Sequence, residues 1–403
     1  MKYEVQGAKN NDILRMNSAL ILKIIRERKI CSRVELAKAT GLTQASITKI
    51  VASLIHSNIL RETGNLECNE RGRKSIGLQL NGDSGKVIAL KFSRSSISVG
   101  VFDISGHLYT KNTFRITEQK TLDVSFQHTI AIIGEYMTAY DNIMAIGVAI
   151  PGPYLKKLNK IALSTEFHDW TSFSPKKTLE AKFNLPVFTI HDVNAATLAH
   201  WWSSNSSKST HSLGYILLGE EISGGLIIDD HLFEGSLGTS IEIGHISMDL
   251  NGELCRCGNR GCLEQYCSTT AIIKKAKKLL VCHPESGLNQ YKELTYYDIF
   301  NEFEKGDKLA HDIIKEACEY IGYGVINFIY TCNPDIIILG DQMTRAGSFL
   351  LETVNRIVKN RVISELYEHT TIRLESLETD SILYGAAAIA TDYILNYSLD
   401  VYQ

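Results

Sequence analysis

A set of four metal-binding residues constrains this chain more than any other feature of its sequence. Nine residues separate a histidine from the first of three cysteines, one separates the next pair, and four precede the last: His245, Cys255, Cys257 and Cys262. Three thiolates and one imidazole complete the tetrahedral ligand set of a structural zinc ion and leave no position for a catalytic water. Gly258 and Gly261 allow the tight turns that bring the ligands together. The sequence therefore predicts one structural Zn²⁺ per chain, in a loop beside a cleft. The alternative is a chance cluster in a glycine-rich loop.

The chain has the length and composition of a soluble protein with two or three domains. It has 403 residues, of which 44% are hydrophobic and 22% are charged. No apolar run approaches the ~20 residues of a membrane span, and the N-terminal MKYEVQGAKNND lacks the apolar core of a signal peptide. The nine cysteines are an odd number spread over a long chain, which favours free thiols over disulfides. We therefore expect a cytoplasmic protein with no membrane partner.

Charge is distributed unevenly between residues 1–80, here termed the head, and the remainder, termed the body. The head holds 14 Lys and Arg against 7 Asp and Glu, a formal charge of +7, whereas the body holds 28 against 38, a charge of −10. This asymmetry suggests that only the head meets a polyanion. A solvated basic surface would have the same composition, so the local sequence pattern must decide.

The head has the pattern of a winged helix-turn-helix DNA-binding domain. Helices are predicted over 17–30, with Asn17 or Ser18 as the cap, over 33–40 after Ser32, and over 44–58 after Thr43. Apolar residues of the third helix recur at i, i+3, i+4 and i+7, so one face packs inward. The opposite face is polar near the helix start, where a recognition helix meets base edges in the major groove. The predicted DNA contacts in this part are Ser32, Arg33, Thr43, Gln44, Ala45, Ser46, Thr48 and Lys49.

A β-hairpin, the wing, is predicted to follow these helices. Its strands span 59–63 and 75–80, and its basic tip contains Arg71, Gly72, Arg73 and Lys74. An Arg-Gly-Arg step can lie in a narrow A/T-rich minor groove, where the negative potential is strongest. We therefore expect the tip to contact DNA beside the major-groove site. The alternative is a small helical domain that contacts proteins and carries a solvated basic turn.

From residue 85 the pattern changes to alternating strands and helices. One buried strand runs into the Gly-Pro loop of MAIGVAIPGPYL, and another, in LPVFTIHDVNAATLAHWW, ends at His191 and Asp192 where a helix begins. Ligands bind at such strand ends in parallel sheets. Several carboxylates and a histidine in a dry cleft suit a polyhydroxylated ligand, because each can accept or share directional hydrogen bonds. For Asp192 alone, a helix cap is the alternative role.

Four motifs of the body resemble those of the ROK family, named for its repressors, open reading frames and sugar kinases. They are IGVAIPGP, HDVNAATLA, GGLIIDDHLFEGSLGTSIEIGH and CRCGNRGCLEQY. The head resembles that family's transcriptional repressors, in the xylose-repressor and N-acetylglucosamine-repressor branch. The resemblance implies an α/β, actin-like body with a sugar bound between two lobes. The lobes span 81–190 and 191–381, and a helix at about 382–398 returns to the first lobe.

The resemblance also implies which residues bind the sugar. Asp192 matches the carboxylate that acts as the base in the kinases and binds a sugar hydroxyl in the repressors. His245 would bind zinc through one ring nitrogen and orient the sugar with the other. His191 stands where the kinases have an asparagine. With the further sugar-contacting positions of the motifs, the predicted set is Glu166, His191, Asp192, Glu242, His245 and Glu264.

The sequence departs from the kinases of this family at three phosphate-binding positions. The kinases have an Asp-x-Gly turn after the first strand, where this chain reads KFS at 91–93. Their second phosphate loop is rich in glycine, whereas this chain has two glutamates at 220–221. A Gly-Gly turn near the adenosine is replaced by Gly-Asp at 340–341. Because carboxylates would repel the phosphates of ATP, we expect no kinase activity and no bound ATP.

Together these patterns predict a sugar-responsive transcriptional repressor. A homodimer, or a tetramer, would place recognition helices in successive major grooves of a palindromic operator with A/T-rich flanks. A monosaccharide between the lobes would change the spacing of the heads and hence the affinity for DNA. Release of DNA on sugar binding is the family's usual direction. Two alternatives are an ATP-dependent sugar kinase with an appended DNA-binding domain and a constitutive architectural DNA-binding protein without a ligand.

Overall fold

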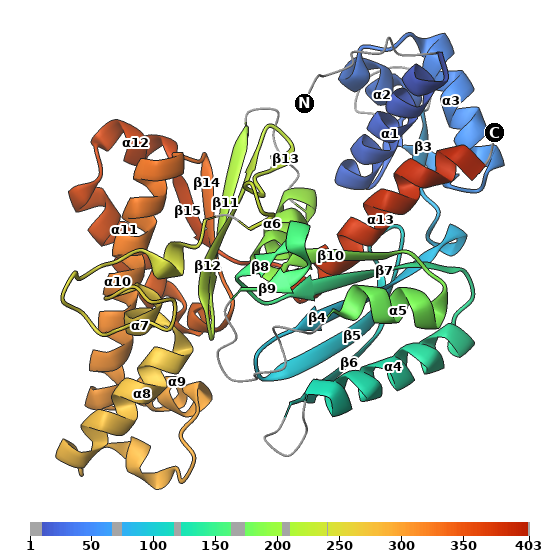
Figure 1. The fold of residues 1–403 in the computed structure, drawn as a ribbon. Coiled ribbons are helices and arrows are strands. Elements are labelled where there is room, and N and C mark those ends of the chain that lie inside the picture. Colours follow the sequence, from blue (N-terminus) through green and yellow to red (C-terminus); the bar gives the residue numbers. More distant parts are fainter. Residues whose placement is uncertain are drawn as a thin grey trace.

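The head combines three helices with a three-stranded antiparallel sheet in the order β1-β3-β2 (Figure 1). The computed structural model describes residues 10–66, 75–116, 122–162, 174–203, 210–239 and 241–401. The elements of the head are α1 (Asn10–Arg28), β1 (Cys31–Ser32), α2 (Arg33–Thr40), α3 (Gln44–His56), β2 (Leu60–Leu66) and β3 (Ser75–Leu80). The inward face of α3 is buried at the predicted spacing, through Ile47, Ile50, Val51 and Leu54.

Local side-chain chemistry sets where α2 and α3 begin. Ser32 and Glu35 form a capping box, in which Glu35 N donates to Ser32 Oγ at 3.3 Å and Ser32 N donates to Glu35 Oε2 at 2.7 Å. Thr43 caps α3 by accepting a hydrogen bond from Ser46 N at 3.2 Å. Both caps are those that the sequence predicts.

The predicted start of the first helix is wrong. The helix already includes Asn10, and neither Asn17 nor Ser18 is its cap. Instead, Ser18 Oγ donates to Leu14 O at 2.8 Å, one turn earlier, as a serine inside a helix does. The prediction failed because a polar residue before an apolar run inside a long helix has the same local pattern as an N-cap.

The first half of the body is built on a mixed sheet in the order β10-β7-β4-β5-β6. β10, β7 and β4 are parallel, and β5 and β6 continue the sheet antiparallel. Its elements are β4 (Lys86–Phe92), β5 (Ser96–Asp103), β6 (Leu108–Arg115), α4 (Leu122–Ala139), β7 (Ile143–Ile150), β8 (Tyr154–Leu155), β9 (Lys160–Ile161), α5 (Pro175–Phe183) and β10 (Val187–His191). Side chains alternate along β4: Ile88 and Leu90 pack with α4 and α5, whereas Val87 and Ala89 pack on the opposite face.

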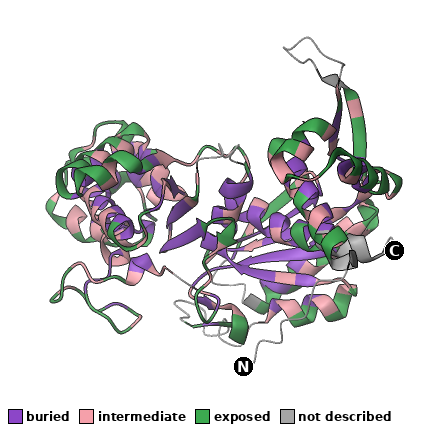
Figure 2. Cartoon of the chain, turned by 90° about the horizontal axis from the view of Figure 1, so that it is seen from above, coloured by how far each residue is buried: buried purple, intermediate pink, exposed green. Residues whose placement is uncertain are grey.

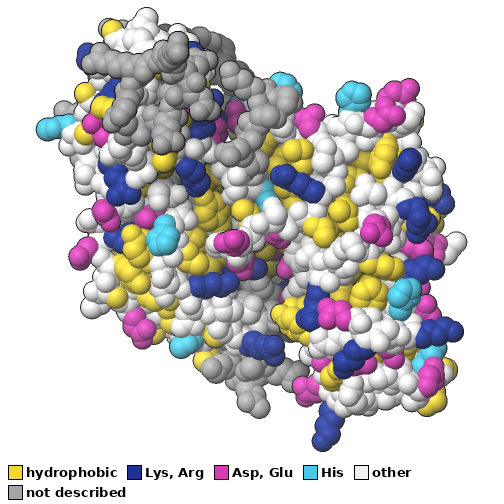
Figure 3. All heavy atoms as spheres, turned by 180° about the vertical axis from the view of Figure 1, so that it is seen from behind, with side chains coloured by type: hydrophobic (Ala, Val, Ile, Leu, Met, Phe, Trp, Pro, Cys, Tyr) yellow, Lys and Arg dark blue, Asp and Glu magenta, His cyan; other side chains and the backbone are white. Residues whose placement is uncertain are grey.

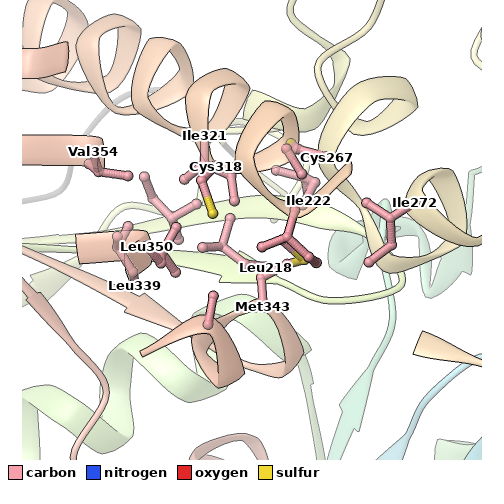
Figure 4. Close-up of a cluster of buried hydrophobic side chains, with 14 of the residues drawn as sticks. Leu218, Ile222, Cys267, Ile272, Cys318, Ile321, Leu339, Met343, Leu350 and Val354 are labelled. Atoms are coloured by element: carbon pink, nitrogen blue, oxygen red, sulfur yellow. The ribbon is translucent and has the colours of Figure 1, made fainter. Parts of the chain in front are cut away.

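The second half is built on a similar sheet in the order β13-β12-β11-β14-β15. β11, β14 and β15 are parallel, and β12 and β13 are antiparallel. Its elements are β11 (Ser212–Leu218), β12 (Ile222–Ile228), β13 (His231–Leu232), α7 (Glu264–Cys267), α8 (Thr269–Leu279), α9 (Tyr296–Glu304), α10 (Lys308–Cys332), β14 (Ile336–Gly340), α11 (Ser348–Arg361), α12 (Ser364–His369) and β15 (Thr371–Leu374). One face of this sheet packs against α8 to α11, where Leu218 and Ile222 meet Cys318 and Leu350 (Figure 4).

Two helices, α6 (Asp192–Ser203) and α13 (Ser381–Val401), lie between the two sheets. α13 packs on β4 and β7, α6 packs on β11 and β12, and the two helices pack on each other. A Cβ at Gly147 would lie 1.8 Å from the Ala386 carbonyl oxygen, and one at Gly385 would lie 1.9 Å from the Ala195 carbonyl oxygen, so both positions require glycine. One cluster of buried residues accordingly includes side chains from both sheets and from both helices, and Figure 2 shows buried positions on each of these elements.

The head rests on the body through α1, which packs against α13 and α6. The Arg26 guanidinium carbon lies 3.3 Å from the centroid of the Trp202 ring at the end of α6. Arg26 Nη1 also donates to Asp392 Oδ1 of α13 at 3.2 Å. The head is thus anchored directly to the two helices between the sheets. None of the helices in the described ranges is long and apolar enough to cross a membrane.

Candidate functional site

The four predicted metal ligands come together in one cluster. The ligand atoms of His245, Cys255, Cys257 and Cys262 all lie within 4.8 Å of one another. His245 Nδ1 and Cys255 Sγ are 3.7 Å apart, and Cys257 Sγ and Cys262 Sγ are 3.6 Å apart. Bonds of ~2.3 Å to sulfur and ~2.0 Å to nitrogen place the corners of a zinc tetrahedron roughly 3.5–3.8 Å apart. The donor set and its spacing therefore fit a tetrahedral metal ion.

The glycines of this loop are required by its backbone. Gly258 and Gly261 have positive φ angles, of 91° and 60°, which side-chain-bearing residues rarely adopt. A Cβ at Gly261 would also lie 2.0 Å from the Asp249 carbonyl oxygen. These turns let the backbone of Cys262 pair with that of Ser247 and so bring the last ligand back to the first.

The protein environment alone does not favour thiolates in this cluster. Burial, followed by the neighbouring Cys257 and Cys255 side chains, raises the pKa of the Cys262 thiol well above its ordinary value. Three ionised sulfurs this close together need a compensating cation, and a divalent ion supplies that charge. The charge balance of the thiolates and the spacing of the four ligands therefore both favour a bound divalent metal ion.

Two of the predicted sugar ligands, Glu242 and Glu264, flank the metal cluster. Glu264 begins α7, and its Oε1 lies 3.7 Å from His245 Nδ1 and 3.5 Å from Cys255 Sγ. Glu242 immediately precedes the short 3₁₀ turn that carries His245, and it accepts a hydrogen bond from Thr239 Oγ1 at 2.6 Å. Both carboxylates are therefore held in place by the same loop that gathers the metal ligands.

Asp192 and His191 lie at the junction of β10 and α6. Asp192 is 7% exposed and accepts a hydrogen bond from Val193 N at 2.6 Å. Burial raises the pKa of Asp192 to about 7, against the opposing effects of the Val193 N–H and the Lys91 charge; the Glu242 carboxylate raises it further. The structure therefore brings Asp192 within the electrostatic reach of the metal loop.

His191 is fully buried beneath the Gly-Pro loop. A Cβ at Gly152 would lie 2.1 Å from His191 Nε2, so this loop can cover the imidazole only with glycine at that position. His191 Nε2 lies 3.3 Å from Asp192 Oδ1, but the two groups are not aligned for a hydrogen bond. Burial lowers the pKa of His191, which favours the neutral ring.

Further buried polar groups near this junction were not predicted from the sequence. Both polar atoms of the Asn194 amide and Ser223 Oγ have no hydrogen-bond partner among the described residues, and the same holds for both ring nitrogens of His191. Asn194 is in the first turn of α6, and β12, which carries Ser223, packs on that helix. Buried polar atoms without protein partners commonly face a ligand or an ordered water. The signal that could have identified Asn194 is a polar residue within the otherwise small and apolar run VNAATLA.

The segments predicted to have lost phosphate binding are occupied by ion pairs within the chain. Lys91 Nζ lies 3.0 Å from Asp380 Oδ2 at the start of α13. Burial opposes the charge of Lys91, but the carboxylates of Asp380 and Asp341 outweigh it and raise the Lys91 pKa. Across the sheets, Arg94 Nε donates to Glu221 Oε1, and Ser95 Oγ donates to Glu220 Oε1 at 2.6 Å.

The predicted DNA-contacting residues of α3 share one exposed face. Gln44, Ala45, Thr48 and Lys49 are all exposed, and Thr48 Oγ1 donates to Gln44 O at 2.8 Å. In contrast, Ser32 is 4% exposed and its hydroxyl donates to Glu35 Oε2, so its side chain serves as a helix cap. The remaining predicted contacts lie at the helix starts: Arg33 pairs with Glu62 of β2, and Thr43 and Ser46 share a hydrogen bond.

Some predicted residues fall outside the described parts of the chain. These are the wing tip, with Arg71, Gly72, Arg73 and Lys74, and the predicted sugar ligand Glu166. On the face of the body seen in Figure 3, acidic and basic side chains are interspersed. The described side chains on this face form no single basic surface of the kind that binds a polyanion.

Some known proteins match nearly the whole chain, whereas others match only about three quarters of it. A model of the ROK family matches residues 87–393. The xylose repressor of Caldicellulosiruptor bescii is 26% identical over 396 residues, which cover 96% of this chain and 98% of the repressor. Among solved structures, a ROK family transcriptional regulator described as a homolog of Escherichia coli Mlc has a TM-score of 0.79 at 24% identity, over 97% of this chain and 98% of that one. A ROK family glucokinase from Streptomyces griseus, in complex with glucose and AMPPNP, has a TM-score of 0.67 at 25% identity; it covers 76% of this chain and 99% of its own.

Proposed function

The chain belongs to the ROK family, and from this premise we propose that it is a sugar-responsive transcriptional repressor. One observation carries the proposal. The repressor relative matches nearly the whole chain, head included, whereas the glucokinase matches only 76% of it. The family match begins at residue 87, so the body alone accounts for about the share of the chain that the glucokinase covers. The likeness to the repressors therefore includes the segment that would bind DNA.

The head, residues 1–80, would be a winged helix-turn-helix domain that binds double-stranded operator DNA. The exposed face of α3 presents Gln44, which can pair with adenine, and Ala45 and the Thr48 methyl, which can contact thymine methyl groups. Lys49 adds a phosphate contact on the same face. The wing tip at 71–74 would enter an adjacent A/T-rich minor groove. We propose a cytoplasmic location for the protein as well, because operator DNA lies in that compartment.

The body would bind a monosaccharide between lobes at 81–190 and 191–381, with the helix at about 382–398 returning to the first. Five of the proposed ligands come from the β10–α6 junction and from the metal loop: His191, Asp192, Glu242, His245 and Glu264. Glu166, outside the described residues, is proposed as the sixth. Support comes from the burial of Asp192 and from polar atoms of His191 and Asn194 that find no protein partner in the described structure. Sugar hydroxyls both donate and accept, so they suit such a mixed set of groups.

The metal cluster would hold one structural Zn²⁺ through His245, Cys255, Cys257 and Cys262. The ion would supply the positive charge that stabilises the thiolates and would fix the loop. The chain's own contribution is to hold Glu242 and Glu264 on either side of that loop. The metal would thus shape the sugar site without taking part in a reaction.

We do not assign the chain kinase activity. In this structure Lys91 is paired with Asp380, and Arg94 is paired with Glu221, in the segments where the kinases hold phosphates. A triphosphate in this region would have to break both pairs and approach buried carboxylates. Incubation of the protein with ATP, Mg²⁺ and a panel of monosaccharides should release no ADP. Sugar-dependent ADP release would instead establish the kinase alternative.

A direct structural route connects the proposed sugar site with the head. Helix α6 begins at Asp192 and ends beside Trp202, on which Arg26 of α1 is stacked. A second contact runs from Lys23 Nζ to Asp230 Oδ1, at 2.9 Å. Movement of α6 on sugar binding would therefore shift α1 and, in a homodimer or tetramer, the spacing of the recognition helices on a palindromic operator.

The proposal is tested by DNA binding in the presence of sugars. Fluorescence anisotropy with duplexes from the upstream region of the chain's own gene and neighbouring genes should reveal a sequence-specific site. One monosaccharide of a panel should change that affinity by a defined factor, and Asp192→Asn should abolish the change while leaving DNA binding intact. Equal affinity for all duplexes would contradict the repressor. A specific site that no sugar affects would favour the architectural alternative.

A further inference from the structure

A cavity of about 370 Å³ lies at the junction of head and body. Three separate parts of the chain line it. These are the C-terminal end of α1, the paired strands β2 and β3, and the turn between β5 and β6, which belongs to the body. Its volume is in the range of small-molecule sites. A ligand here would touch head and body at once; we refer to this space as the junction cavity.

The charged groups that line the junction cavity are all cationic or histidine. They are Arg26, Lys29, Arg61 and His107, and the described lining contains no Asp or Glu. Two nearby carboxylates offset part, but not all, of the charge of the three cations: Asp392 is paired with Arg26, and Asp103 acts on Lys29. Asp103 Oδ1 accepts hydrogen bonds from Ser105 N at 2.8 Å and His107 N at 3.0 Å. The cavity wall therefore has an excess of positive charge.

Arg26 is held rigidly in this wall. Its side chain is 6% exposed, it is stacked on Trp202, and one nitrogen is paired with Asp392. Its Nε has no hydrogen-bond partner among the described residues. Arg61 is held as well, because it donates to the amide oxygen of Gln79 when that amide is oriented to accept. Two guanidinium groups are thus pre-positioned beside the cavity, which lowers the entropic cost of binding an anion.

The cations also destabilise one another in this arrangement. Burial, followed by the neighbouring Arg26 charge, lowers the pKa of the Lys29 ammonium. Cations at the end of α1 can stabilise the helix dipole, which would account for Arg26 and Arg28. That role does not account for Arg61 on β2 or for His107 in the body. Convergence of charge from three elements instead indicates a site for an anion.

We propose that the junction cavity binds a small phosphate-bearing metabolite and thereby holds the head in a fixed position on the body. Phosphate is the anion that fits best, because it accepts several charge-assisted hydrogen bonds at once and matches the fork of a guanidinium. This site is separate from the sugar site between the lobes. The proposal does not depend on the DNA-binding function, because its test measures anion binding alone.

The test uses the full-length protein and two simple probes, inorganic phosphate and pyrophosphate. Isothermal titration calorimetry at constant ionic strength should show one saturable site per chain, with tighter binding of pyrophosphate. Arg61→Gln and His107→Gln change exposed side chains of the cavity wall and should each weaken binding by roughly tenfold, the loss expected for one charge-assisted hydrogen bond. Lys38→Gln removes the same charge as Arg61→Gln from an exposed position on α2 outside the cavity, and it should bind the probes as the wild type does.

Each other outcome would overturn the proposal. Absence of saturable binding, or equal weakening by Lys38→Gln, would show that the cavity cations hold no specific anion. If phosphate fails to bind but Arg61→Gln and His107→Gln reduce the salt dependence of duplex DNA binding, the cavity contacts the DNA backbone instead. Melting temperatures within a few degrees of the wild type would confirm that the variants are folded.

Discussion

Arg94, in the turn between β4 and β5, forms an ion pair with Glu221, in the turn between β11 and β12. The two turns belong to different sheets, so the pair joins the two halves of the body directly. The neighbouring hydrogen bond from Ser95 to Glu220 repeats the connection. These two turns, predicted from the sequence to correspond to phosphate-binding segments of the kinases, thus hold the two sheets together in this structure.

Loss of this connection should loosen the body. Burial raises the pKa of Glu221 to about 8, and the Arg94 charge opposes this effect. Arg94→Gln removes the ion-pair partner of this buried carboxyl and should therefore lower the free energy of unfolding by about 2–4 kcal/mol. The Lys274–Glu253 pair is the matched control, because both of its side chains are largely exposed. Lys274→Gln should cost less than about 1 kcal/mol in the same urea titration. Similar losses for both variants would contradict a structural role for Arg94.

Removal of a metal ligand should destabilise the loop. Cys257→Ser should abolish bound zinc, measured by elemental analysis of the purified protein, and should reduce stabilisation by the effector sugar. Cys282→Ser is the matched control, because Cys282 is an exposed free cysteine outside the cluster. An unchanged metal content in Cys257→Ser would remove the metal site from the proposed function.

Two residues of α3 should affect DNA binding differently. Gln44→Ala should relax base preference at one operator position by about 1–3 kcal/mol, because the amide would read an adenine edge. Lys49→Ala should instead weaken binding to all sequences and reduce the salt dependence by about one ion. Competition assays with single-base operator variants, at several salt concentrations, distinguish the two effects. A uniform loss from Gln44→Ala would place that residue on the backbone rather than on a base.

Trp202 should be needed for communication between the sugar site and the head. It lies in the last turn of α6 and supports Arg26 of α1, so Trp202→Phe should weaken this contact while keeping an aromatic ring in place. We expect sugar binding and sugar-free DNA binding to stay close to wild type, while the ratio of the two DNA affinities, with and without sugar, falls toward one. Thermal shift with sugar and anisotropy with operator measure these quantities separately. A full sugar response in this variant would exclude the route through α6.

The stability of the protein should depend on pH through Asp192. Burial raises the Asp192 pKa to about 7 from 3.8, so the folded state holds a proton there that the unfolded chain releases. The resulting cost to stability is absent below about pH 4, grows as the pH rises to about 7, and reaches at most about 4 kcal/mol. Asp192→Asn cannot ionise, so the difference in unfolding free energy between variant and wild type should shift in favour of the variant over this range. A difference that stays constant from pH 4 to pH 8 would contradict the raised pKa.

Much of the candidate site could be predicted because its residues are close in sequence. The metal ligands lie within one loop, and the glycines that turn this loop are part of the same motif. The caps at Ser32 and Thr43 and the buried stripe of α3 depend on periodicity and on neighbours within one turn. The start of α1 was mispredicted because a serine within a helix has the same local signal as a cap.

The sequence by itself determined the local structures: the metal loop, the helix caps, the buried stripe of α3, and the family membership that its motifs indicated. Only the tertiary structure decided which distant charges meet. Arg94 and Glu221 are 127 residues apart, and Lys91 and Asp380 are 289 apart. Nothing in the local pattern around a charged residue specifies its distant partner, because that choice depends on how the two sheets and the helices between them pack. The same packing stacks Arg26 on Trp202 and thereby joins the head to the helix that begins at Asp192.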